Sequence, residues 1–419
     1  MRILLCNKFY YHRGGDCIYT LELERLLHQH GHDVAIFAMK YPDNLPSPWQ
    51  DYFPSEASFS FGPKMINALF RPLGSREVKE AFERIIQDFK PDVIHLGNIH
   101  SQLSPLLAEI AHSRGIHTVW TLHDYKLLCP RYDCMQPNGL VCEECFCNQK
   151  EATGKAVKSP NPNACLRHHC LKGSLLASFI GWVEMKKWNC DRLTRITDTW
   201  ICPSQFMLKK MIQGGFPHEK LIHLCNFIDV EKCLMENYSQ REDYYCFVGR
   251  LSHEKGVETL INAASHLPYR LIIIGDGPLR SHLNEKIKQL CCQDRIQLAG
   301  QKNWEQIKHL VAHARLLVAP SEWYENNPLS ILEAKCLGTP IIGARIGGIP
   351  ELINPISNGK ALGEADGDLF IPRNVPDLTE KINLLWTHPF NHEQIAKRSQ
   401  QRFSAESYYE SLMKLYAPS

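Results

Sequence analysis

The stretch of sequence that decides the fold is residues 316–334, which read LLVAPSEWYENNPLSILEA. It opens with a short apolar run, 316–319, of the kind that forms a buried strand. A polar loop follows, and apolar residues then recur at helical spacing over 328–337. The stretch therefore predicts a strand, a loop and a helix in succession, which is the repeating unit of an α/β fold with a parallel sheet.

The same alternation extends through both halves of the chain. Further strands of the second half are predicted at 245–249, 270–274, 295–298 and 340–342, with helices at 256–264, 278–290 and 304–314. Strands of the first half are predicted at 2–6, 33–39, 91–96, 118–122 and within 200–229, with helices at 18–31 and 78–89. We therefore expect two Rossmann-like, doubly wound domains, 1–225 and 226–399, facing each other across a cleft. A C-terminal helix over residues 400–419 is expected to pack back on the first domain.

Composition excludes several classes of protein. The chain has 419 residues and carries 47 Lys and Arg against 45 Asp and Glu, so nothing favours a nucleic acid as partner. The longest nearly pure apolar run, 175–183, is far shorter than the ~18 residues that span a bilayer. The apolar stretch at 1–6 is shorter than the ~7–15 residues of a signal-peptide core, so we expect a cytoplasmic protein.

Two cations follow the first predicted strand of the second domain. Arg250 comes directly after Gly249, and Lys255 precedes Gly256 at the start of a predicted helix. Because a helix amino terminus carries partial positive charge and free N–H groups, this place favours a phosphate. A diphosphate could bind here without a metal ion; the alternative is two solvated surface cations.

A second glycine turn follows the next strand, where Gly275-Asp276-Gly277-Pro278 leads into a helix. It lacks the full G-x-G-x-x-G fingerprint of a dinucleotide site, so a nicotinamide oxidoreductase is the least favoured reading. Alone, the turn is equally explained as a tight connection between strand and helix.

Two glutamates stand eight positions apart in the deciding stretch. Glu325 lies in the loop, and Glu333 falls within the helix among Leu329, Ile331 and Leu332. A carboxylate in the apolar part of a helix needs a partner, since an unpaired buried charge is costly. Sugar hydroxyls would supply hydrogen-bond donors; the alternative is a buried ion pair.

Together these residues resemble the retaining, GT-B-fold glycosyltransferases of family 4. Glu325 and Glu333 fit the E-x7-E motif of that family, and the other matching pairs occur in the order that the family has: Gly14-Gly15, His123-Asp124, Gly249-Arg250, Lys255-Gly256 and Gly275 to Pro278. The resemblance covers nearly the whole chain. One departure is Asn326-Asn327-Pro328, where relatives often have Gly-Phe-Gly.

The resemblance implies a role for each matching residue. Arg250 and Lys255 would hold the donor diphosphate, Glu325 would approach the donor sugar, and His123 would lie near the transferred sugar. The implied donor-binding residues are Gly14, Gly15, Gly249, Gly277, Ser321, Asn326, Asn327, Leu329 and Glu333. Base contacts near Gly300 and Gln301 leave UDP- and GDP-linked donors both open.

The implied activity is the transfer of a sugar from a nucleotide to a hydroxyl acceptor with retention of configuration, without a catalytic metal. Cations already in place at the leaving diphosphate do what a divalent metal does elsewhere. The expected setting is bacterial surface polysaccharide assembly: O-antigen, capsule or exopolysaccharide. Alternatives are an epimerase or phosphorylase of the same fold, or a non-catalytic, zinc-stabilised binding module.

Cysteines crowd into one stretch after His123-Asp124. Of the 17 in the chain, seven are Cys129, Cys134, Cys142, Cys145, Cys147, Cys165 and Cys170. Cys142 and Cys145 form a C-x2-C pair, so a structural zinc held by Cys129, Cys142, Cys145 and Cys170 is one hypothesis. Since a second C-x2-C pair is missing, buried or loop thiols are the other, and similar spacing occurs in some family members.

Two segments of the first domain combine apolar and basic residues. One covers residues 59–71, with six large apolar side chains beside Lys64 and Arg71, and the other covers 175–188. Either could lie on an anionic membrane surface, where a lipid-linked saccharide acceptor would be found. The alternative for both is ordinary packing against the first-domain core.

Overall fold

The computed structural model describes residues 1–56, 70–146, 161–356 and 364–417. The chain divides into two compact units, Met1–Cys225 with Tyr408–Ser419, and Asn226–Ser407. The division after Cys225 falls at the expected boundary, whereas the second unit extends beyond its expected end at residue 399. The reason is that helix α14 (His392–Arg402) packs against α12 (Leu329–Cys336), so the chain returns to the first unit only afterwards.

The first unit is built on a six-stranded parallel sheet with the order β2-β1-β3-β4-β5-β6. Its strands are β1 (Arg2–Cys6), β2 (Asp33–Phe37), β3 (Val93–Leu96), β4 (His117–Thr121), β5 (Thr199–Cys202) and β6 (Leu221–His223). In the register, Leu4 lies between Ala35 and Ile94. The nearly continuous apolar runs of these strands reflect burial on both faces.

Helices connect these strands, and they include the two that the sequence predicts, over 18–31 and 78–89. The α-helices of the first unit are α1 (Gly15–Gln29), α3 (Arg76–Phe89), α4 (Leu106–Ser113), α5 (Asn163–Arg167), α6 (Leu175–Lys187), α7 (Cys190–Ile196), α8 (Gln205–Gln213) and α15 (Ala405–Tyr416). Helix α3 shows why they form: Val78, Phe82, Ile85 and Phe89 recur every three or four residues and are all buried.

The second unit has its own six-stranded parallel sheet, ordered β12-β11-β10-β7-β8-β9. The strands are β7 (Glu242–Val248), β8 (Arg270–Ile274), β9 (Ile296–Gly300), β10 (Ala314–Ala319), β11 (Ile341–Ala344) and β12 (Gly367–Phe370). Strand β12 is missing from the sequence-based prediction because glycine and aspartate at its start are poor strand formers. Its formation depends on pairing with β11 and on the ion pair of buried Asp368 with Lys381, at 2.8 Å.

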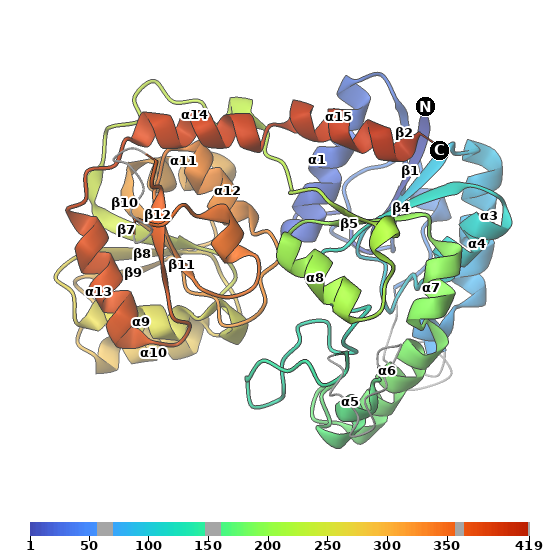
Figure 1. The fold of residues 1–419 in the computed structure, drawn as a ribbon, viewed down its shortest axis with the longest axis horizontal. Coiled ribbons are helices and arrows are strands. Elements are labelled where there is room, and N and C mark those ends of the chain that lie inside the picture. Colours follow the sequence, from blue (N-terminus) through green and yellow to red (C-terminus); the bar gives the residue numbers. More distant parts are fainter. Residues whose placement is uncertain (57–69, 147–160, 357–363, 418–419) are drawn as a thin grey trace. The chain divides into compact units, whose positions relative to one another are not determined.

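Helices cover both faces of the second sheet (Figure 1). One apolar layer joins the sheet to α9 (Val257–Ser265), α10 (Arg280–Gln289) and α13 (Val375–Trp386). The other joins it to α11 (Trp304–His313) and α12. The unit is therefore doubly wound, and the loops after β7, β8, β10 and β11 leave the carboxyl edge of one sheet, where such folds bind ligands.

Within the described ranges, no helix combines the length and apolar character needed to cross a bilayer.

Candidate active site

Lys255 and Glu325 meet at the carboxyl edge of the second sheet. Lys255 ends a short 3-10 turn (His253–Lys255) after β7, and Glu325 lies in the loop after β10. The Lys255 Nζ atom donates to Glu325 Oε1 at 2.5 Å, and the Ser321 hydroxyl donates to the same oxygen at 2.8 Å. A backbone hydrogen bond from Glu322 N to Glu254 O, 2.9 Å, ties the two loops together. The structure thus joins two predicted site residues directly.

The Glu325 carboxylate is buried but stays ionised. Only 8% of its side chain is exposed, against 24% for Lys255. Burial by itself raises the pKa of Glu325, but attraction to Lys255 and hydrogen bonds from Lys255 and Ser321 outweigh burial and hold that pKa below its usual value. The site therefore keeps a negative charge and a positive charge side by side at neutral pH.

Arg250 lies on the loop directly after β7 and is exposed. Among the described residues, no ion pair or hydrogen bond engages its guanidinium group. An exposed guanidinium near the start of α9 can accept a phosphate at little desolvation cost, because Arg and a helix amino terminus both favour one.

The glycine turns after β7 and β8 lie directly against each other. Gly249 N donates to Ile274 O, and Leu251 N donates to Asp276 O, both at 3.0 Å. A side chain on Gly277 would place its Cβ 2.5 Å from Leu251 O, so only glycine permits this approach. The turn that the sequence leaves ambiguous is thus a close contact that shapes the Arg250 loop.

A third loop, after β11, holds the backbone of Glu325. Gly348 N donates to Glu325 O at 2.7 Å. Gly347 has a φ of +60°, and a Cβ there would lie 2.3 Å from the same carbonyl oxygen. The position of Glu325 therefore depends on a glycine that sequence reasoning assigns no role.

The remaining predicted donor-binding residues differ in their exposure to solvent. Asn327 is buried, and its side-chain oxygen and carbonyl oxygen accept hydrogen bonds from Asn226 at 3.1 and 2.9 Å. Asn326 is also buried, and Leu329 is half-buried. Glu333 lies between the buried Leu332 and Ala334 on α12 and is itself half-buried.

In the first unit, Gly14 and Gly15 lie where α1 begins. Gly14 O accepts hydrogen bonds from Cys17 N and Ile18 N, which starts the helix after β1. A Cβ added to Gly15 would meet nothing within 4 Å, so the space on the side-chain side of this glycine is open. Asp16, in the first turn, accepts from the Asn98 amide at 3.1 Å.

His123 follows β4 and lies among charged groups of neighbouring loops. Burial lowers the pKa of His123 to about 4, an effect that Lys8 reinforces and Asp16 opposes. Its Nε2 atom is buried and has no hydrogen-bond partner among the described residues. His123 is therefore a neutral imidazole with one unused ring nitrogen.

Lys8 and Asp16 are charged residues near His123 that the sequence analysis does not identify. Lys8 Nζ donates to the Asn98 side-chain oxygen at 3.1 Å, while the Asn98 amide donates to Asp16. The sequence contains one indication of a role for Lys8, its place in the chain. It comes two residues after β1, and the carboxyl ends of parallel strands commonly carry functional groups.

The cysteines after His123 are largely buried thiols. Cys145, Cys165 and Cys170 pack together, and a hydrogen bond from Cys134 lowers the pKa of Cys129. In the ranges described, no three or more His, Cys, Asp or Glu side chains are arranged to hold a metal ion. The zinc set of Cys129, Cys142, Cys145 and Cys170 stays a prediction, which the zinc content of the purified protein tests; Cys147 lies outside the described residues.

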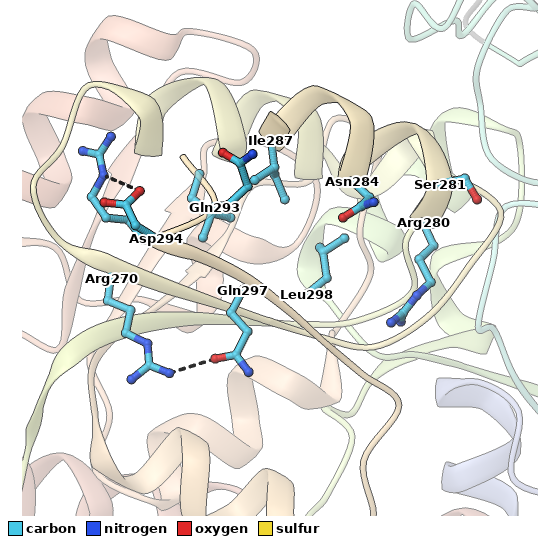
Figure 2. Close-up of a pocket in the computed structure, with 11 residues that line it drawn as sticks. Arg270, Arg280, Ser281, Asn284, Ile287, Gln293, Asp294, Gln297 and Leu298 are labelled. Carbon is cyan, nitrogen blue, oxygen red and sulfur yellow. Dashed lines mark hydrogen bonds and ion pairs between the residues drawn. The ribbon is translucent and has the colours of Figure 1, made fainter. Parts of the chain in front are cut away.

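A pocket of about 590 Å³ lies elsewhere in the second unit, between β9 and α10 (Figure 2). Its polar lining is largely self-paired: Arg270 donates to Gln297 at 2.8 Å, and Arg280 contacts Asp276 at 3.3 Å. None of the predicted site residues lines it. Because its charges are already paired, it identifies no ligand.

Two family profiles match the chain in succession. "Glycosyltransferase Family 4" matches residues 13–137, and "Glycosyl transferases group 1" matches residues 236–402. The first match contains the Gly14 and His123 loops, and the second contains every predicted site residue of the second unit.

Curated relatives match over part of their length. The sulfoquinovosyl transferase of Arabidopsis thaliana is 28% identical over 234 residues, 52% of this chain and 44% of the relative. The GDP-mannose-dependent alpha-mannosyltransferase of Corynebacterium glutamicum is 38% identical over 120 residues, 29% of this chain and 27% of the relative. The amylovoran biosynthesis glycosyltransferase of Erwinia amylovora is 28% identical over 199 residues, 44% of this chain and 48% of the relative. The chain thus matches about half or less of the length of each.

Solved structures match over nearly the full chain. Sucrose-phosphate synthase from Thermosynechococcus elongatus has a TM-score of 0.67 at 17% identity and covers 99% of this chain and 98% of its own. Anabaena HepE in complex with UDP-glucose has a TM-score of 0.63 at 17% identity, with the same coverage. Identities this low speak for the fold alone, and the expected GT-B fold is confirmed. With both halves matched in order by profiles of one kind, the chain belongs to the group 1 glycosyltransferases of family 4.

Proposed function

We propose that this protein transfers a sugar from a nucleotide-sugar donor to a hydroxyl group of an acceptor. The observation that carries the proposal is the Lys255–Glu325 pair at the carboxyl edge of the second sheet, with the exposed Arg250 on the same loop as Lys255. Two cations suit a diphosphate, and a buried carboxylate beside them suits the hydroxyls or the developing positive charge of a sugar.

The proposed mechanism follows the charges. When the bond between the anomeric carbon and the diphosphate breaks, negative charge grows on the β-phosphate and the sugar becomes oxocarbenium-like. Arg250 and Lys255 would stabilise the first charge and Glu325 the second. We further propose that the acceptor hydroxyl attacks the anomeric carbon from the face that the diphosphate leaves and passes its proton to that diphosphate, so the configuration is retained. Glu325 is committed to Lys255 and Ser321 and is a poor nucleophile. A catalytic metal would not be needed.

The first unit carries groups of its own that suit a sugar nucleotide. The open start of α1 at Gly15 can approach a phosphate, and the neutral His123 can exchange a hydrogen bond with a sugar hydroxyl. Glu333, half-buried on α12, is proposed to bind the ribose, as the family resemblance implies.

The relatives indicate which nucleotide sugars to test first as donors. One solved structure of this fold holds UDP-glucose, and one curated relative is named as GDP-mannose-dependent. UDP- and GDP-linked sugars are therefore the first donors to test. A role in bacterial surface polysaccharide assembly is proposed from the likeness to the amylovoran biosynthesis glycosyltransferase.

Weak attachment to an anionic membrane surface is part of the proposal, but only one of the two expected segments supports it. Leu175, Leu176 and Phe179 of α6 are 59%, 63% and 49% exposed. Arg71, in contrast, is buried and donates to Gln102 O, so its expected membrane role is wrong; residues 59–69 lie outside the described ranges. Greater co-sedimentation with anionic than with neutral vesicles tests the α6 surface.

Donor hydrolysis over a panel of UDP- and GDP-linked sugars, with EDTA present, tests the proposed function. We expect one donor to be cleaved by the wild type and Glu325→Gln to lower that rate by about a hundredfold or more. The matched control is Glu393→Gln, which removes an exposed ion pair with Lys397 in the same unit and should retain the rate. Absence of both cleavage and binding for every donor contradicts the proposal, while a rearranged or phosphorolysed sugar favours the epimerase or phosphorylase.

A further inference from the structure

The C-terminal helix α15 brings two tyrosines into a buried polar network of the first unit. Tyr408 and Tyr19 share a hydrogen bond of 2.5 Å between their hydroxyl groups, and Tyr19 also contacts Thr121 Oγ1 at 3.2 Å. Farther along, His95 bonds to Thr121 at 2.9 Å and to the Tyr416 hydroxyl at 2.6 Å. All five side chains are at most 3% exposed, so the network is a buried chain of polar groups.

One end of this network contacts His123. The Tyr19 ring lies edge-on to the His123 imidazole, with centroids 4.8 Å apart and planes at 64°. The ring of Tyr408 is in turn edge-on to Tyr19, at 6.1 Å and 85°. The hydrogen bond between the Tyr408 and Tyr19 hydroxyl groups holds the Tyr19 ring in place, and the Tyr19 ring packs against the His123 imidazole.

The buried hydroxyl group of Tyr408 is satisfied by its hydrogen bond to Tyr19. Burying a phenol hydroxyl requires a hydrogen-bond partner, whereas phenylalanine would fill nearly the same space without that requirement. A fully bonded polar network selects one arrangement of its members, while apolar packing tolerates several. The group next in line to Tyr19 is His123, whose Nε2 atom no protein group among the described residues engages.

We propose that Tyr408 is a positioning residue for the transfer reaction, acting through Tyr19 to hold the His123 imidazole in one orientation. The inference rests on the proposed function, because it takes His123 as the group beside the transferred sugar. It adds that α15, at the far end of the sequence, takes part in arranging the site as well as closing the first unit.

The decisive variant is Tyr408→Phe, and the chain offers a matched control in Tyr409→Phe. Tyr409 lies on the same helix and docks it to the same unit, through a hydrogen bond to His32 Nε2 at 2.8 Å and stacking on His30 at 3.6 Å. Each variant removes one hydroxyl group whose hydrogen bond helps hold α15 on the first unit, but only Tyr408 contacts Tyr19. A role limited to fastening the helix would affect both variants alike.

The first readout does not depend on activity. In proteins with isotope-labelled histidine, the imidazole signal of His123, assigned with His123→Gln, should shift in Tyr408→Phe and stay in place in Tyr409→Phe. An unmoved signal in a folded Tyr408→Phe overturns the inference even if donor cleavage is normal. Absence of donor cleavage with a shifted signal contradicts the proposed function instead and leaves the positioning intact.

The second readout is the kinetic split. Tyr408→Phe should lower kcat by about tenfold, less than the roughly hundredfold cost of a full misplacement, with the donor KM unchanged. If the single variant is too unstable, Tyr19→Phe/Tyr408→Phe removes both hydroxyl groups of the 2.5 Å contact together, and its loss should be no greater than that of the single variant. Equal losses of kcat in Tyr408→Phe and Tyr409→Phe overturn the inference.

Discussion

Lys255→Ala is expected to lower sugar transfer by at least about a hundredfold while the protein stays folded. Removing one preorganised cation from a developing negative charge typically costs on the order of 3 kcal/mol in the transition state. The substitution also removes a hydrogen bond from the buried Glu325. Its Oε1 atom accepts from both Lys255 and Ser321 in the wild type, and only the Ser321 hydrogen bond to that atom would remain. Without the ammonium group, the pKa of the buried Glu325 carboxyl should rise.

The measurement is kcat/KM for the donor together with the melting temperature. Lys381→Ala is the matched control, since Lys381 also pairs with a buried carboxylate of the second unit, Asp368, at 2.8 Å. Both variants should lose some stability, but only Lys255→Ala should lose turnover. Wild-type turnover by a folded Lys255→Ala protein would refute the assignment.

Gly347→Ala is expected to reduce activity nearly as much, although no side chain of the site is altered. An alanine Cβ would lie 2.3 Å from Glu325 O and 2.7 Å from Glu325 N, closer than atoms can pack. The Glu325 loop must shift, and misplacing a catalytic group by about 1 Å can cost roughly a hundredfold in rate. The left-handed backbone of residue 347, with φ of +60°, adds about 1–2 kcal/mol of strain for alanine.

Gly115→Ala separates the two effects. Gly115 has a φ of +65°, but a Cβ there meets nothing within 4 Å, so the substitution introduces backbone strain without a clash. Thermal unfolding and donor turnover should be measured for both. Gly115→Ala should be slightly less stable than the wild type and fully active. Full activity of Gly347→Ala would show that the loop can hold Glu325 without the close approach.

Local pattern was enough to predict most of the elements. The strands and helices around the deciding stretch, such as β8 at 270–274 and α11 from Trp304, follow from apolar periodicity over a few residues. Strand β12 is not predicted, because its glycine and buried aspartate form a strand only by pairing with β11 and by the ion pair with Lys381. Periodicity carries no information about a partner that lies elsewhere in the chain.

The sequence by itself determined the α/β class, the change of unit after Cys225 and which loops carry charged and glycine residues, because each depends on neighbours along the chain. Only the tertiary structure decided that Lys255 bonds Glu325 across 70 positions, that Glu333 is half-buried, and that Tyr408 reaches Tyr19 across 389. The physical reason is that strand and helix type follow from local patterns, whereas side-chain pairing depends on how distant loops converge at the edge of a sheet.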